Sequence, residues 1–245
     1  MCSVAEGQYL SAGYYLARPA ERGAHTSATL IPAKLISASS CICEFFPDSW
    51  AIKWSSEHPN EREESASAFR IQPHEIDAVI QWATNAFEKE FGWPNVFYSL
   101  EAAFAGRSKI LASDVDVAVF GLGLNREYSE EFLRYAKPPE QTPGYAPQGE
   151  TGIYECVNAQ RQISPGGRQI GFELLAVFLG LLTCSWLCNS LETVFEETLG
   201  VRPNKYGFIA DYSDAKRCTD YISRGEVGAE PGLWLPWLIT LYSEK

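Results

Sequence analysis

Apolar residues recur every three or four positions between residues 76 and 91, which is the period of an amphipathic helix. Pro73 suits the first turn of such a helix, and Gly92 suits its end. The pattern therefore predicts one helix over residues 72–92. Its buried stripe would consist of Ile76, Val79, Ile80, Ala83, Phe87 and Phe91.

Other segments have the composition of strands. Residues 114–124 are apolar after Asp116, which predicts a strand in the middle of a sheet. The aromatic residues of 12–20 predict a strand that ends at Pro19, and residues 50–54 alternate like a short half-buried strand. Residues 30–46 fit a helix or a strand equally well.

The second half adds a helix, a loop and a hairpin. We expect a helix over residues 126–136. Residues 137–152 contain four prolines and three glycines, which predicts a loop between two domains or a long functional loop. The sequence Ser-Pro-Gly-Gly at 164–167 separates two apolar segments, which predicts a β-hairpin.

Two further helices should end near Gly200 and Ile222. The apolar tail, residues 232–242, is interrupted by Pro236, so we expect it at a sheet edge or packed under another element. Interleaved helices and strands with a hairpin favour the α+β class, a mixed, largely antiparallel sheet packed with several helices. We predict a single domain over residues 1–245, which could divide into subdomains 1–110 and 111–245.

Cys184 and Cys188 lie four residues apart, before an apolar stripe that continues to Leu199. This predicts a helix that begins at Thr183 or Ser185, with both thiols in its first turn. A reactive cysteine would need a histidine base, and all three histidines lie in the first third of the chain. The C-x₃-C spacing without a second pair does not fit a zinc or redox site. We interpret the segment as a core helix that buries two thiols.

Other sequence features give weak indications of catalysis. Gly121 and Gly123 begin like a dinucleotide-binding turn, but Arg126 stands where the third glycine belongs. Asp114 and Asp116 point to one side of a strand and, with Glu173, could hold a divalent metal. A metal-dependent hydrolase is therefore an alternative function. Familiar nucleophile, phosphate-loop and zinc motifs are missing from the sequence, which favours a binding protein without a cofactor.

Charge and composition limit the classes of partner. The net charge is −11, and residues 51–100 hold eight acids against four bases. Such a surface repels nucleic acid and would attract a basic protein. The longest apolar run, residues 172–182, is far shorter than the roughly 20 residues of a membrane span, and we expect no membrane partner. Seven scattered cysteines and no recognisable secretory signal predict a cytoplasmic protein.

Part of the second half is similar to a known class of proteins. It resembles the immunity proteins that accompany secreted bacterial toxins, in polymorphic-toxin systems and type VI secretion. The residues that carry this resemblance are Gly171, Phe172, Glu173, the block 185–189, Leu191, Glu192, Pro203, Asn204 and Gly207. The resemblance implies an antidote without catalytic residues, which occludes the basic cleft of a cognate toxin, for example a nuclease. A non-catalytic adaptor that uses Trp234 and Trp237 for contact is a further alternative.

Two acidic surfaces are candidates for toxin binding. One is the acidic loop, with Glu57, Glu61, Glu63 and Glu64. The other combines Glu130 and Glu131 of the helix 126–136 with Tyr145 of the proline-rich loop. Rim charges of this kind mainly speed association, so tight inhibition would also need a buried aromatic or arginine anchor.

Overall fold

The computed structural model describes residues 7–17, 20–21, 34–39, 45–46, 71–87, 89–92, 96–110, 117–137, 152–178, 181–225 and 227–243. The strands are β1 (Tyr9–Ala17), β2 (Ala20–Glu21), β3 (Lys34–Leu35), β4 (Phe45–Phe46), β5 (Phe91–Gly92), β6 (Val96–Phe97), β7 (Ala118–Asn125), β8 (Arg168–Phe178), β9 (Leu181–Ser185) and β10 (Leu233–Tyr242). The helices are η1 (Pro73–Glu75), α3 (Ile76–Ala86), α4 (Leu100–Ile110), η2 (Arg126–Tyr128), α5 (Ser129–Ala136), α6 (Gly152–Asn158), α7 (Leu191–Leu199) and α8 (Tyr212–Ser223).

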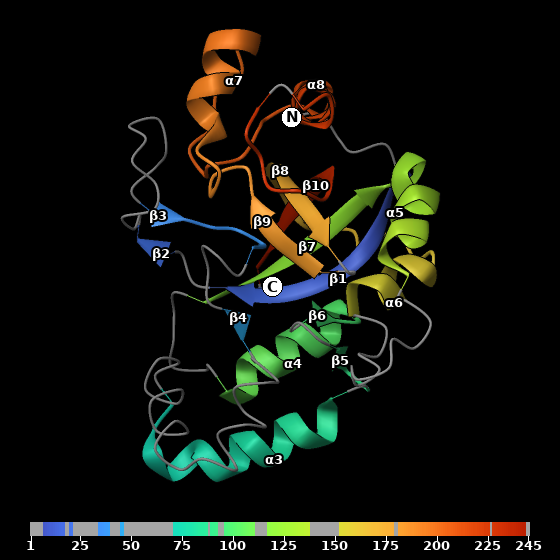
Figure 1. Ribbon diagram of the computed structural model, residues 1–245. Coiled ribbons are helices and arrows are strands. Elements are labelled where there is room, and N and C mark those ends of the chain that lie inside the picture. Colours follow the sequence, from blue (N-terminus) through green and yellow to red (C-terminus); the bar gives the residue numbers. More distant parts are fainter. Residues whose placement is uncertain are drawn as a thin grey trace, which may run out of the picture.

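One twisted sheet forms the centre of the protein (Figure 1). Its order is β5-β6-β1-β7-β10-β8-β9, and β4 also pairs with β1. The strands of this sheet pair antiparallel throughout the described part of the chain. The predicted α+β class, with a largely antiparallel sheet and several helices, is therefore confirmed. Because β1 pairs with β7, the sheet joins strands from both sides of residue 110, while the predicted domain limits stay a prediction.

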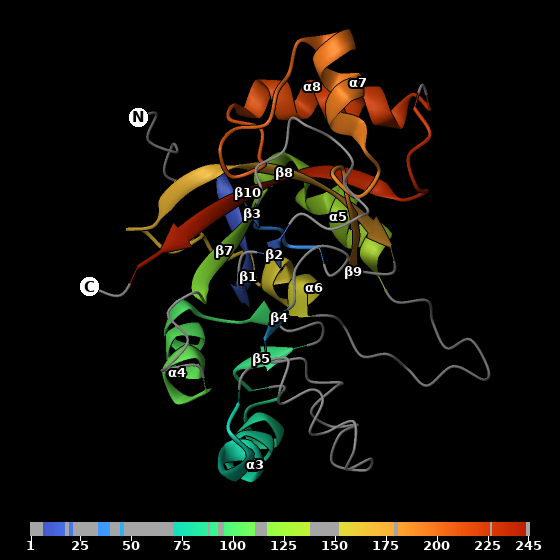
Figure 2. The ribbon, with the colours of Figure 1, turned by 90° about the vertical axis from the view of Figure 1, so that its left-hand side faces the viewer.

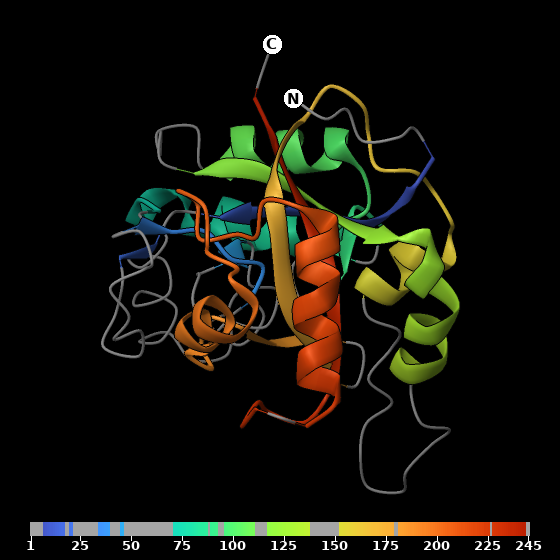
Figure 3. The same ribbon diagram turned by 90° about the horizontal axis from the view of Figure 1, so that it is seen from above.

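Helices cover both faces of the sheet. The alternation of β10 divides its side chains, with Leu235, Trp237 and Ile239 in the core under α5 and α6. Trp234 and Leu238 lie on the other face, in the core with α7 and α8. On that second face α8 runs along β8 and β10, which is plain from above (Figure 3). α3 and α4 pack at the other end of the molecule, near β1 (Figure 2).

The expectation that residues 232–242 lie at a sheet edge is wrong. β10 is a central strand between β7 and β8. Pro236 is opposite Leu174 of β8, whereas the ladder with β7 begins only at Trp237. The proline, which cannot donate a backbone hydrogen bond, thus lies beyond the β7 ladder and interrupts no pairing there.

The helix predicted for residues 72–92 exists but ends earlier. Its helical part comprises η1 and α3 and stops at Ala86, because Phe87 has extended dihedral angles of φ −56° and ψ 139°. Phe91 belongs to β5 instead, where it pairs with Phe97. Phe91 also stacks on Trp82 with ring centroids 5.8 Å apart. Burial of Phe91 in this aromatic cluster takes precedence over the helical period.

The hairpin predicted around residues 164–167 is also wrong. Residues 152–158 form α6, in which Ile153, Cys156 and Val157 are buried at helical spacing. The strand that follows residues 164–167, β8, pairs in a hairpin with β9, where Phe178 is opposite Leu181.

The segment with the two cysteines begins as a strand. Ser185 of β9 pairs with Leu175 of β8, and α7 starts only at Leu191, after a turn. Cys184 is therefore buried on a strand, and Cys188 is half-buried in the turn. The predicted helix start at Thr183 or Ser185 is wrong, but its end is confirmed. Gly200 has the left-handed conformation of a helix terminator, with φ 68°.

Residues 50–54 and 138–151, for which a strand and a loop were predicted, lie outside the described residues. Several other elements agree with their patterns, and the strand predicted over residues 12–20 corresponds to β1. The strand predicted over 114–124 corresponds to β7, which lies centrally between β1 and β10. The helix predicted over 126–136 corresponds to η2 and α5, and α8 ends close to Ile222. Among the described helices, none has both the length and the apolar character needed to cross a membrane.

Candidate functional site

The outward side of α5 carries two exposed carboxylates, and one of them, that of Glu131, lies beside an exposed aromatic ring. We call the exposed side chains of Glu130, Glu131 and Tyr135 the α5 face. Tyr135 follows Glu131 by one helical turn, so both side chains lie on the same strip of the helix. Tyr135 is 44% exposed, and among the large hydrophobic residues of the described chain only Tyr135 and Phe178 are exposed. Within the described part of the chain, neither carboxylate has a hydrogen bond or an ion pair.

The opposite side of α5 fixes this face to the sheet. Phe132 is completely buried and meets the ring of Trp237 edge to face, with centroids 5.6 Å apart and an interplanar angle of 86°. Ser129 and Ala136 are also buried on this side. Such aromatic pairs contribute about 0.5–1.5 kcal/mol beyond the burial of their area. A partner would therefore meet a preformed helix and would not have to order it.

The start of the helical segment is held by capping. The side chain of Asn125 accepts a hydrogen bond from the Glu127 amide at 3.1 Å, and the hydroxyl of Ser129 donates to the Arg126 carbonyl at 2.8 Å. Asn125 is the last residue of β7, so the strand passes directly into η2 and α5. This connection fixes the direction in which α5 leaves the sheet.

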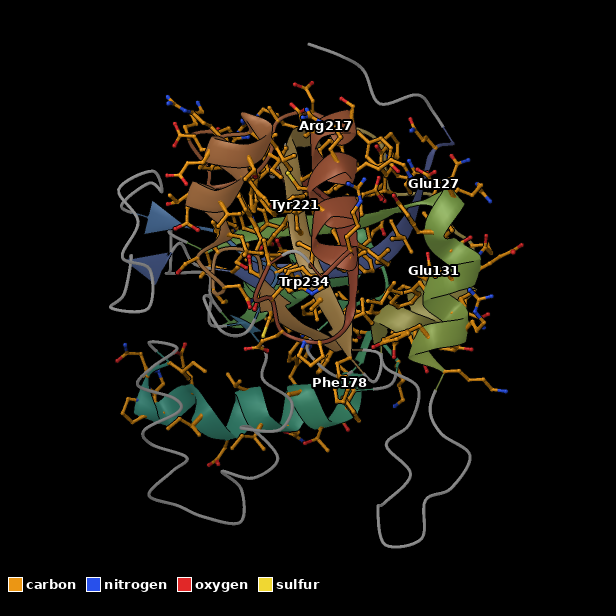
Figure 4. All side chains as sticks on the ribbon, turned by 45° about the horizontal axis from the view of Figure 1, so that its top comes forward. Glu127, Glu131, Phe178, Arg217, Tyr221 and Trp234 are labelled. Atoms are coloured by element: carbon orange, nitrogen blue, oxygen red, sulfur yellow. The ribbon has the colours of Figure 1, made fainter. Side chains whose placement is uncertain are left out.

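Glu127 connects the same segment to α8. The hydroxyl of Tyr212 donates a hydrogen bond to its carboxylate, and the Lys216 ammonium lies 3.4 Å from the other oxygen. Lys216 also donates to the Tyr128 hydroxyl at 2.9 Å, and this bond raises the pKa of Lys216. Figure 4 shows Glu127 and Glu131 along this segment, with Arg217 on the neighbouring α8. Unlike the carboxylates of the α5 face, that of Glu127 is neutralised within the protein.

Only part of the predicted binding set can be placed. Glu130 and Glu131 lie together on α5, as the helical pattern predicted. Glu57, Glu61, Glu63, Glu64 and Tyr145 lie outside the described residues. Sequence reasoning missed Tyr135, although its distance of four residues from Glu131 could have identified it. Arg134 is exposed on the same helix, so the local charge is mixed and not purely acidic.

Glu173, the third residue of the predicted metal set, is wholly buried. The hydroxyl of Ser37 donates to one carboxylate oxygen, and the Ala38 amide donates to the other at 2.8 Å. Burial raises the pKa of Glu173 to about 7. Asp114 and Asp116 lie outside the described residues, among which no group of three His, Cys, Asp or Glu side chains could hold a metal. In the described part of the chain, the hydrogen-bond partners of the Glu173 carboxylate are protein groups.

The glycines once compared with a nucleotide-binding turn lie inside a strand. Gly121 pairs with Tyr14 of β1 and with Thr240 of β10, and Gly123 lies in the same two ladders. A Cβ atom at Gly121 would lie 2.8 Å from the ring of Tyr242, so close packing accounts for the glycine. The backbone amides here belong to the sheet and form no phosphate-binding loop.

Comparison with protein-family models, curated proteins and solved structures gives no match. The resemblance to immunity proteins therefore stays a prediction. The arrangement of α5 supports binding chemistry, since unpaired carboxylates accept hydrogen bonds from lysine and arginine, and an exposed tyrosine offers apolar area with a polar tip.

Proposed function

We propose that this protein is an immunity protein that binds a cognate secreted toxin and occludes its basic active-site cleft. The observation that carries the proposal is the α5 face, where Glu130, Glu131 and Tyr135 are exposed on a helix anchored by Phe132. Carboxylates without partners in the described chain can pair with the cations of the cleft. Tyr135 supplies an aromatic anchor of the kind that dominates interface energetics.

The charge of the whole chain supports the same partner. A net charge of −11 attracts a basic protein over a distance of about one Debye length, roughly 8 Å at physiological salt. The carboxylates of the α5 face would then form the close contacts. Association should accordingly be faster at low salt, while Tyr135 should mainly govern dissociation.

The test begins with co-expression of this protein with the product of the adjacent reading frame, followed by purification of the pair. We expect a complex of fixed stoichiometry and loss of host survival when this protein is omitted. E130K/E131K should slow association by roughly tenfold, and Y135A should speed dissociation by a similar factor. E197K/D220K is the matched control, because it reverses two exposed acids on α7 and α8 and changes the net charge equally.

The outcomes separate the parts of the proposal. If no complex forms and survival does not depend on this protein, it is not an antidote to that toxin. If a complex forms and the α5 variants behave like the control, the toxin binds elsewhere and the α5 face is excluded.

A further inference from the structure

A pocket of about 390 Å³ lies beside the sheet, apart from the α5 face. Its walls come from β1, Lys89, residues 98–101 at the start of α4, residues 155–156 of α6 and the segment 159–164. Pockets that bind small molecules commonly have volumes of about 300–1,000 Å³. Most of the residues that line this pocket carry a hydroxyl, charged or amide group.

A bulge in β1 shapes one wall. Ser11 and Tyr14 would point to opposite faces of a regular strand, yet both line the pocket. The register of β1 against β7 shifts between these two residues, and Gly13 has φ 103°. A Cβ atom at Gly13 would collide with Val96 and come within 3.2 Å of the Cys156 sulfur. The glycine is therefore required for the bulge that brings both hydroxyls to one wall.

The hydroxyl groups of this wall are held in place. Tyr14 donates to the Ser164 hydroxyl at 2.6 Å and accepts from the Ser164 amide at 2.9 Å. Ser11 is 5% exposed, and its oxygen accepts from the Gly13 amide at 3.2 Å. The Ser11 hydroxyl proton has no acceptor among the described residues, so it can donate to a bound molecule.

Four charged side chains line the same pocket without pairing. Lys89 and Arg161 are cations, and Glu101 and Glu155 are anions. Within the described chain, none of these four side chains makes an ion pair or a hydrogen bond. A small molecule that carries both a positive and a negative charge can therefore form ion pairs with the anionic and the cationic side chains at the same time.

The first turn of α4 adds donors for an anion. The hydroxyl and the carbonyl of Ser99 accept from the amides of Ala102 and Ala103, both at 3.1 Å. The amides of Leu100 and Glu101 come before the first backbone hydrogen bond of α4, so they have no acceptor within the helix. Both residues line the pocket. With the positive end of the helix dipole and Arg161, they suit a carboxylate.

Cys156 also lines the pocket, but its environment disfavours nucleophilic chemistry. Burial raises the pKa of its thiol to about 12, so the thiolate is scarce at neutral pH. The pocket is thus equipped to hold a polar molecule, and its thiol is not activated to attack one.

We propose that this pocket binds a small zwitterion, a free amino acid or a dipeptide. Its carboxylate would meet the first turn of α4 and Arg161, and its ammonium group would meet Glu155. The Ser11 hydroxyl would supply a further hydrogen bond. This binding does not depend on the proposed antidote function.

The test is calorimetric titration of the full chain with each of the twenty common L-amino acids and with glycylglycine, up to millimolar concentration. We expect at least one of these molecules to bind with a stoichiometry of one. Its N-acetylated and carboxamide forms should bind at least about tenfold more weakly, because each lacks one of the two charges. If none of the probes binds, or if the blocked forms bind equally well, the proposal is overturned.

Variants locate the site. R161Q and E155Q should each weaken binding at least about tenfold, whereas R134Q and E197Q, which change exposed charges elsewhere, should leave it unchanged. Thermal unfolding of each variant shows whether it is folded, and the side chains of Arg161 and Glu155 are solvent-accessible enough for replacement. Binding that persists in both pocket variants would place the molecule elsewhere and exclude this pocket.

Discussion

The hydroxyl of Ser37 donates a hydrogen bond to the carboxylate of Glu173, across 136 residues of sequence. Ser37 itself is held by the Ser39 amide, which donates to its oxygen at 2.9 Å. Together with the Ala38 amide, these bonds fix the segment 37–39 over β8. Glu173 is therefore a structural carboxylate, and its ionisation is coupled to folding.

The buried carboxylate should make stability depend on pH. The pKa of Glu173 is about 7 in the folded protein, against 4.5 as the ordinary value. Between these values the folded state keeps a proton that the unfolded state releases, so the free energy of unfolding falls as pH rises through this window. The shift corresponds to about 3 kcal/mol. We expect the stability of E173Q relative to the parent to increase by about this amount between pH 4 and pH 8, measured by urea unfolding.

The control for this measurement is E130Q, which removes an exposed carboxylate. Its stability relative to the parent should change little over the same pH range. A parallel pH profile for E173Q and the parent would mean that Glu173 titrates alike in both states, contrary to the effect of burial.

Removal of the Phe132 ring should detach α5 from the core. F132A leaves a cavity opposite Trp237, and we expect it to lower the free energy of unfolding by about 3–5 kcal/mol. F178A is the matched control, because Phe178 is 48% exposed at the end of β8 and should cost well under half as much. Denaturant unfolding compares the two, and equal losses would contradict the packing described for α5.

Gly171 should tolerate no side chain. Its φ of 141° lies in a region that L-residues rarely adopt, and a Cβ atom would lie 2.6 Å from Phe208 Cβ and 2.8 Å from the Ile209 carbonyl. We expect G171A to lose at least about 1–3 kcal/mol of stability. G228A, where a Cβ atom would meet open space, should stay within about 0.5 kcal/mol of the parent in the same thermal or denaturant assay.

Local patterns were sufficient where one element had one clear period. β7 and α5 were predicted because continuous apolar residues pass into a helical stripe just after Asn125. Local patterns failed where contacts with other elements of the fold determine the secondary structure. Cys184 was predicted to lie in the first turn of a helix, but pairing of β9 with β8 extends the strand to Ser185. Pro236 suggested an edge, and only the register against β7 shows how a central strand accommodates it.

The candidate site was predicted in the same partial way. Glu130 and Glu131 follow from the polar side of the helix, because surface positions can be inferred from period alone. Glu173 was named as a metal ligand only in the alternative function. Its contact with Ser37 depends on a segment distant in sequence, which no local pattern specifies. Ser11 and Tyr14 share a pocket wall only because of the bulge at Gly13, which the strand period conceals.

The central position of β10 also determines when the sheet can be completed during synthesis of the chain. β7 and β8 precede β10 in the chain, and β10 lies between them in the sheet. The edge of each strand that faces β10 therefore stays unpaired until residues 233–242 are present. Until the ribosome has released this strand, β7 and β8 both expose an unpaired backbone edge, where nascent chains are prone to aggregate. The sheet should therefore close late, after translation of β10, and fragments that end before residue 233 should depend on chaperones to stay in solution.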